Sequence, residues 1–88
     1  MKPAPRMRRR LSDREDEVMR LVCIGKTNYE ISELLGITEA TVKAHVTHVM
    51  AKMGVSNRAQ VLLKALIKRI VTVKSLKTAY QLDMLEGE

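Results

Sequence analysis

The sequence predicts an all-α protein, a single tetrahelical helix-turn-helix domain built from four helices. Three observations predict it. Apolar residues recur at helical spacing in four segments, capping residues and glycines separate these segments, and the third segment, residues 38–53, has two unlike faces. A chain of 88 residues can bury one small core without metal or disulfide staples.

Residues 38–53 are the segment around which the other segments are arranged. Their larger apolar residues stack on one helical face, and small residues occupy the opposite face, with cationic side chains beside it. A slim cationic helix fits the major groove of B-DNA, about 12 Å wide against a helix diameter of about 10–12 Å. An ordinary amphipathic surface helix is the alternative. The stacked residues are Val42, Val46, Val49 and Met53, and the small ones are Ala40, Ala44, Thr47 and Ala51.

The chain before this segment contains an arm and two helices. Residues 1–10 combine two prolines with five bases and are predicted to be a disordered basic arm or linker. Residues 12–25 form the first helix, with Ser12 and Glu15 as a capping box and Gly25 as its end. Its acidic first turns would be repelled by phosphates, so it should support DNA binding without touching DNA. Its predicted core stripe is Val18, Leu21 and Val22.

The second helix begins at Thr27, which forms a capping box with Glu30, and it ends at Gly36. Only the tight turn Gly36-Ile37 separates it from Thr38, the cap of the third helix. A short helix, a turn with glycine and a longer helix make a helix-turn-helix, whose second helix lies in the major groove. Ile31, Leu34 and Leu35 are its predicted core residues.

After Gly54, Asn57 and Gln60 begin a fourth helix with two apolar sides. Val61, Leu62 and Ala65 can face the core, and the second side predicts self-association; a tail folded back over it is the alternative. This second side consists of Leu63, Leu66, Ile67 and Ile70. Residues 71–88 form a C-terminal extension that could contain a short helix.

Charge is unevenly distributed along the chain. The net charge is +6, and residues 38–77 hold eight bases against Glu39 alone, which suits a polyanionic partner. Two tyrosines are the only aromatic residues, which favours duplex DNA over stacking-type single-strand or RNA binding. The sequence contains no long apolar run and no signal-peptide pattern, so we expect no membrane association and a cytoplasmic location.

Candidate chemistry elsewhere is sparse. His45 and His48 are three residues apart, but no cysteine or carboxylate has a matching offset, so no metal site is expected. Cys23, the single cysteine, fits a small buried side chain. Arg58 could bind phosphate or pair with Glu15 or Glu17. No nucleophile set or glycine-rich loop is evident, so we expect neither enzymatic activity nor a cofactor.

The stretches LSDREDEVMRLV, GKTNYEISELLGIT and TVKAHVTHVMAKMGVSNR occur in an order and spacing that resemble the LuxR/FixJ/NarL-type (GerE) DNA-binding domain, the output module of many bacterial response regulators. The resemblance covers residues 11 to about 66 and places the domain at residues 11–70. It implies transcriptional regulation by a homodimer on an inverted repeat of double-stranded DNA, with the fourth helix as dimer contact. It also makes RNA polymerase a candidate partner and gives this chain no small-molecule ligand.

The resemblance implies roles for individual residues. Lys43, Ala44 and Thr47 would face base edges, with Lys43 donating to guanine and Ala44 meeting a thymine methyl. Phosphate contacts would come from Thr27, Asn28, Thr38, Thr41, His48 and Lys52. The dimer interface would contain Leu63, Leu66, Ile67 and Ile70. Tyr29 stands where the family more often has a basic or polar residue, and Thr47 where some relatives have lysine.

Two rival functions remain open. The chain also resembles the promoter-reading region of a sigma factor, although the residues from Thr41 to His45 and the run Lys52-Met53-Gly54-Val55 favour the regulator family. A protein-interaction module that dimerises with or titrates a regulator could use the apolar side of the fourth helix, but Lys43 and Lys52 argue against that use.

Overall fold

The computed structural model describes residues 10–86, with side chains placed as far as residue 82. Within this part the chain forms helices only, namely α1 (Asp13–Cys23), α2 (Asn28–Leu35), α3 (Glu39–Met53), α4 (Arg58–Ile67) and α5 (Val73–Glu86). The prediction of an all-α helix-turn-helix domain is confirmed. The predicted arm lies outside the described residues, apart from Arg10.

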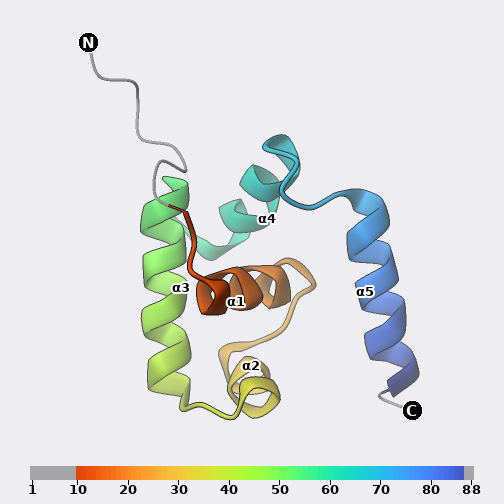
Figure 1. Cartoon of the computed structure of the whole chain (residues 1–88), viewed down its shortest axis with the longest axis horizontal. Coiled ribbons are helices and arrows are strands. Elements are labelled where there is room, and N and C mark those ends of the chain that lie inside the picture. Colours follow the sequence, from red (N-terminus) through yellow and green to blue (C-terminus); the bar gives the residue numbers. More distant parts are fainter. Residues whose placement is uncertain (1–9, 87–88) are drawn as a thin grey trace.

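The helices are arranged around α1, which lies in the middle of the molecule in Figure 1. α3 runs along one side of α1, α2 lies near one end of α3, and α4 lies towards the other end. α5 stands apart on the side away from α3. The helix-turn-helix pair α2–α3 is therefore held by α1 and α4 at one edge of the molecule.

The helix ends follow the local sequence. Both predicted capping boxes are present: Glu15 N–H donates to Ser12 Oγ at 3.1 Å, and Glu30 N–H donates to Thr27 Oγ1 at 3.1 Å. Gly36 ends α2 with φ of 68°, a left-handed conformation that glycine adopts without steric cost. The turn into α3 is short because this reversal needs a single residue.

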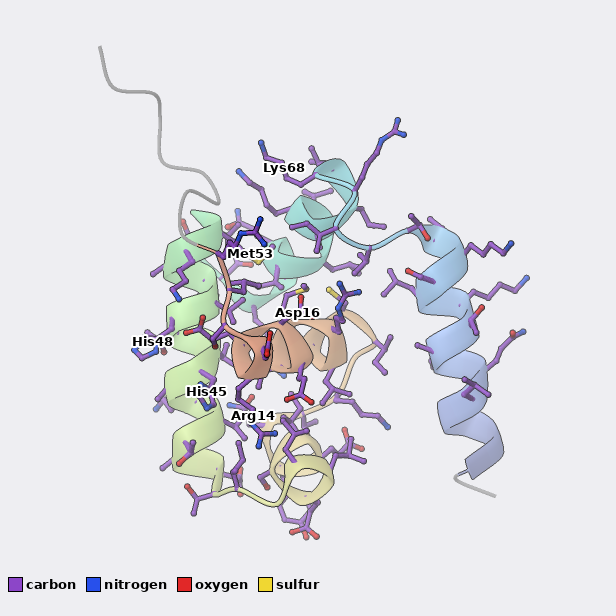
Figure 2. The ribbon with its side chains drawn as sticks, in the orientation of Figure 1. Arg14, Asp16, His45, His48, Met53 and Lys68 are labelled. Carbon is purple, nitrogen blue, oxygen red and sulfur yellow. The ribbon has the colours of Figure 1, made fainter. Side chains whose placement is uncertain are left out.

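The core lies where α1, α2, α3 and α4 meet. Both the stripe predicted for α3 and its inward direction are confirmed, and Figure 2 shows Met53 directed towards the interior. Removing such side chains from water supplies most of the favourable folding free energy. The buried apolar residues are Val18, Met19, Val22, Cys23, Ile31, Val42, Val46, Val49, Met53, Val61, Ala65 and Val71.

One leucine does not lie where the sequence predicts. Leu34 is 57% exposed, whereas Leu21 and Leu35 are partly buried and pack against the core as predicted. α2 turns Ile31 and Ser32 inward, and the Ser32 hydroxyl donates to the Tyr29 carbonyl at 2.6 Å. Because its hydroxyl is satisfied within α2, Ser32 can be buried. The buried side of the helix is therefore centred between Ile31 and Ser32, which turns Leu34 outward.

Arg58 joins α4 to the segment between α1 and α2. Its Nη1 donates to Asn28 Oδ1 at 2.6 Å, and its Nη2 donates to the Lys26 carbonyl at 2.6 Å. The interpretation that Arg58 pairs with Glu15 or Glu17 is wrong. The guanidinium instead satisfies a backbone carbonyl and an amide oxygen, and so fixes the start of α2 against the start of α4.

The α4–α5 connection contains a strained residue. Arg69 has φ of 58°, and the next N–H, that of Ile70, donates back to the Ala65 carbonyl at 2.9 Å. This resembles the usual left-handed helix end, but an arginine stands where glycine is favoured. α5 then runs for 14 residues, longer than the short helix that we considered for the extension. Its partly buried Leu76 packs against the core.

None of the helices between residues 10 and 86 combines the length and the apolar character needed to cross a membrane.

Replacing Arg69 with glycine should stabilise the domain by up to about 1 kcal/mol, because glycine relieves the left-handed strain but adds unfolded-state entropy. Urea unfolding would measure the change. Arg69→Ala is the matched control, since it removes the same side chain but retains the strained Cβ. Equal stabilities of the two variants would contradict the strain.

Candidate nucleic-acid interface

The outer face of α3 is open to solvent. Lys43, Ala44 and Thr47 are exposed, and Val42 and Val46 on the other side of the helix are buried. The Thr47 hydroxyl donates to the Lys43 carbonyl at 3.0 Å, which leaves its oxygen lone pairs and methyl group to the outside. The face therefore offers the Lys43 cation, two methyl groups (Ala44 and Thr47) and the Thr47 hydroxyl oxygen as acceptor, over little more than one helical turn.

The start of α3 contains a small hydroxyl network. Thr38 Oγ1 accepts from the Thr41 N–H at 3.1 Å and donates its own proton to Thr41 Oγ1 at 2.9 Å. Both residues are exposed. Because Thr41 accepts in this pair, its own O–H remains able to donate to a phosphate oxygen.

The start of α2 is fixed by its helix cap and by a hydrogen bond from Arg58. The Thr27 hydroxyl accepts from Glu30 N–H, and Asn28 gives its carbonyl oxygen to Arg58. That bond leaves the amide N–H groups of the Asn28 side chain, which are hydrogen-bond donors, for an anion. Of the residues proposed for phosphate contact, Thr27 and Asn28 thus lie at one end of α2, separate from the set on α3.

Lys52 has an intramolecular partner that the sequence analysis missed. Its Nζ lies 2.7 Å from Glu15 Oε1 and 3.4 Å from the Arg10 carbonyl oxygen. The Glu15 residue is only 6% exposed, so Lys52 neutralises a carboxylate that lies at the surface of the core. The two residues are 37 positions apart, and no local pattern signals such a contact.

His48 lies beside this pair. Its Nδ1 is 3.8 Å from Glu15 Oε2, and most of its side chain is exposed on the outer side of α3 (Figure 2). The hydrogen bond from Lys52, together with the one from the Ser12 backbone, lowers the pKa of Glu15 below its ordinary value. The positive charge of Lys52 is therefore partly compensated within the fold, whereas that of Lys43 has no ion-pair partner among residues 10–82.

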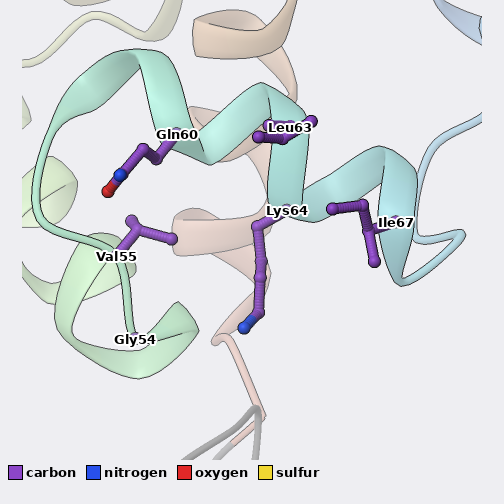
Figure 3. A pocket seen from close by; sticks show the side chains of 6 residues that line it. All are labelled: Gly54, Val55, Gln60, Leu63, Lys64 and Ile67. Atoms are coloured by element: carbon purple, nitrogen blue, oxygen red, sulfur yellow. The ribbon is translucent and has the colours of Figure 1, made fainter.

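Only part of the second apolar side of α4 is exposed to solvent. Leu63 and Ile67 are 57% and 65% exposed, whereas Leu66 and Ile70 are partly buried against the core of their own chain. The exposed pair borders a depression of about 180 Å³ (Figure 3). It is lined by Gly54, Val55, Gln60, Leu63, Lys64 and Ile67.

Residues 9–65 match the family described as bacterial regulatory proteins, luxR family, which is well over half of the chain. The chain belongs to the luxR family. That membership places α2 and α3 as its helix-turn-helix pair and favours the regulator interpretation over the sigma-factor one.

Individual relatives of this luxR-family domain are regulators. It is 43% identical over 65 residues to the quorum sensing-dependent transcriptional regulator RpaR of Rhodopseudomonas palustris, covering 74% of this chain and 27% of RpaR. It is 50% identical over 50 residues to the transcriptional regulatory protein LiaR of Bacillus subtilis, covering 57% of this chain and 24% of LiaR.

A solved structure also matches the luxR-family domain. It is that of the response regulator ChrA of a heme-sensing two-component system, with a TM-score of 0.68 and 37% identity over 80% of this chain and 33% of ChrA. The domain thus spans between about a quarter and a third of the regulators that it resembles. These similarities support a role in transcriptional DNA binding.

Other chemistry is limited in the described part of this luxR-family domain. Among the side chains that the structure describes, residues 10–82, no three His, Cys, Asp or Glu come together in a way that could hold a metal ion. Burial raises the pKa of the Cys23 thiol to about 11, so this cysteine is a thiol at neutral pH and a poor nucleophile.

Replacing Glu15 with glutamine should cost about 1–3 kcal/mol at neutral pH, because a charge-assisted hydrogen bond to Lys52 is lost. The folded-state pKa is lowered, so this contribution is fully present above the ordinary value of 4.5 and disappears as the pH falls through the lowered value. Urea unfolding of both proteins over a pH series should therefore show two stabilities that converge in acid.

Asp16→Asn is the matched control for this test. Asp16 pairs with Arg20 at 2.8 Å on the exposed side of α1, and its loss should cost only a few tenths of a kcal/mol. A Glu15→Gln deficit that stays constant with pH would exclude the ion pair as its cause.

Proposed function

We propose that this domain binds double-stranded DNA sequence-specifically for transcriptional regulation, with α3 in the major groove. The proposal depends on the outer face of α3, where Ala44 and Thr47 are exposed on the side away from the buried stripe and Lys43 is exposed beside them. Small side chains let the helix approach the base edges, and a lysine can donate to guanine O6 and N7.

The charge distribution supports duplex DNA as the partner. No acidic residue occurs among residues 40–82, whereas the acids that begin α1 lie on a different helix. Thr38, Thr41 and His48 would bind phosphates beside α3, and Thr27 and Asn28 would bind them at α2. Lys52 would contribute while sharing its charge with Glu15, so we expect it to add less than an unpaired lysine.

We further propose that two copies bind an inverted repeat through α4. Leu63 and Ile67 are the exposed apolar residues of this helix, and Leu66 and Ile70 lie behind them. A twofold interface places the same two side chains of each copy against each other, so a short apolar stripe is doubled in area.

Replacing Lys43 with alanine should weaken binding to the preferred site by about 1–3 kcal/mol and relax base choice there. The preferred site would be selected from a random duplex pool, and affinities for it and for random duplex would be measured across a salt series. Lys68→Ala is the control, because Lys68 is an exposed cation at the end of α4. It should leave base choice unchanged.

The same salt series tests the rival function. A protein-interaction module would bind duplex weakly and without steep salt dependence. Equal losses of Lys43→Ala on selected and random DNA would instead leave DNA binding intact but remove the base-reading role of Lys43.

Replacing Ile67 with glutamate should convert the DNA-free dimer to monomer. The change removes the more exposed apolar side chain of α4 and would bring two carboxylates out of water near the twofold axis. Sedimentation velocity would measure the change. Ile67→Leu keeps the apolar surface and should retain the dimer. If the Ile67→Glu variant remained dimeric, the dimer contact would lie outside this side of α4.

A further inference from the structure

α5 lies beyond the residues that match the family, and its surface remains largely uncovered. The family match ends at residue 65, and α5 begins at Val73. Leu76 packs against the core, but α5 packs extensively against none of the other four helices. In Figure 1 it stands to the side of them.

The uncovered side of α5 carries an apolar stripe with a cation at its middle. Val73, Lys77 and Tyr80 are spaced i, i+4 and i+7, so they share one helical face. Val73 is 71% and Tyr80 51% exposed. Lys74 is exposed beside the stripe, and neither lysine forms an ion pair with another described residue. We name Val73, Lys74, Lys77 and Tyr80 the α5 stripe.

α2 presents the complementary surface. Tyr29 and Leu34 are 58% and 57% exposed, and the acidic residues Glu30 and Glu33 lie between them around the same outer face of the helix. Glu33 forms no ion pair within the described part of the chain. We name these four residues the α2 patch.

The two surfaces are similar in composition and length and opposite in charge. Each exposes two large apolar residues. The charges of Lys74 and Lys77 on α5 are positive, and those on α2 are negative, where Glu33 is exposed and Glu30 also accepts a hydrogen bond from the Thr27 N–H. At a rise of about 1.5 Å per residue, the α5 stripe is about 10 Å long and the α2 patch about 8 Å. Opposite charges flanked by apolar residues provide both attraction and a preferred register.

We propose that the α5 stripe of one copy docks on the α2 patch of a second copy. Leu76 is the neighbour of the stripe that packs against the core, three residues from Val73 and four from Tyr80. Val73 and Tyr80 nevertheless remain more than half exposed, so their own chain leaves them uncovered and a second copy can cover them. The two surfaces differ, so the contact is heterologous and continues from copy to copy, unlike a twofold contact through α4. Its small area makes it a weak, transient contact.

Sedimentation velocity of the full chain without DNA tests this proposal independently of DNA binding. The Ile67→Glu background removes association through α4. The average mass should then still rise with concentration at low salt, and it should fall as salt is added because the charges are exposed. A mass that stays monomeric at every concentration would overturn the proposal, as would docking of α5 on its own α2, which is independent of concentration.

Two charge reversals make the test specific. In this background, Lys77→Glu and Glu33→Lys should each weaken self-association about tenfold, since each places like charges together at the contact. An equimolar mixture of the two variants should associate again, because every α5 stripe then finds a complementary α2 patch on the other variant. Failure of the mixture to associate would overturn the pairing of these two surfaces.

Two further measurements keep the outcome interpretable. Helix content by circular dichroism confirms that α5 remains folded in each variant, and Tyr80→Ser removes an apolar anchor without changing charge and should also weaken association. If Lys77→Glu left self-association unchanged but lowered the salt slope of random duplex binding, α5 would be a phosphate contact and the proposal would be wrong.

Discussion

The whole arrangement depends on burial of one face of α3. Val42, Val46, Val49 and Met53 anchor this helix against α1, α2 and α4, and that packing leaves the opposite face directed outward. Because a helix rotates as a rigid unit, fixing the inward stripe also fixes the direction of Lys43, Ala44 and Thr47. A cavity in this stripe would loosen the outer face as well as the core.

Two polar contacts define how the supporting helices hold α3. The Glu15–Lys52 pair joins the start of α1 to the end of α3, and the Arg58 guanidinium joins the start of α4 to the start of α2. Each contact has one charged group near a capped helix start, namely Glu15 in α1 and Arg58 in α4. They link elements distant in sequence, so the body of the domain sets the spacing of the two helix ends that we propose to bind phosphates.

The core domain and the extension differ in how their surfaces are used. α1 to α4 cover one another and leave open faces on α2, α3 and α4. α5 is added outside this set, with a strained Arg69 at the junction. The proposed α2–α5 contact would let neighbouring copies associate through surfaces that neither α3 nor the exposed side of α4 uses.

Much of this molecule follows from the sequence alone. The helices of the core domain, their caps, the tight turn at Gly36 and the inward stripe of α3 could be predicted, because each depends on residues within one or two helical turns. Only the tertiary structure decided that Leu34 is exposed, that Lys52 rather than Arg58 pairs with Glu15, and that α5 stands free. These outcomes depend on the rotation of one helix against another and on residues far apart in the chain, which local spacing does not encode.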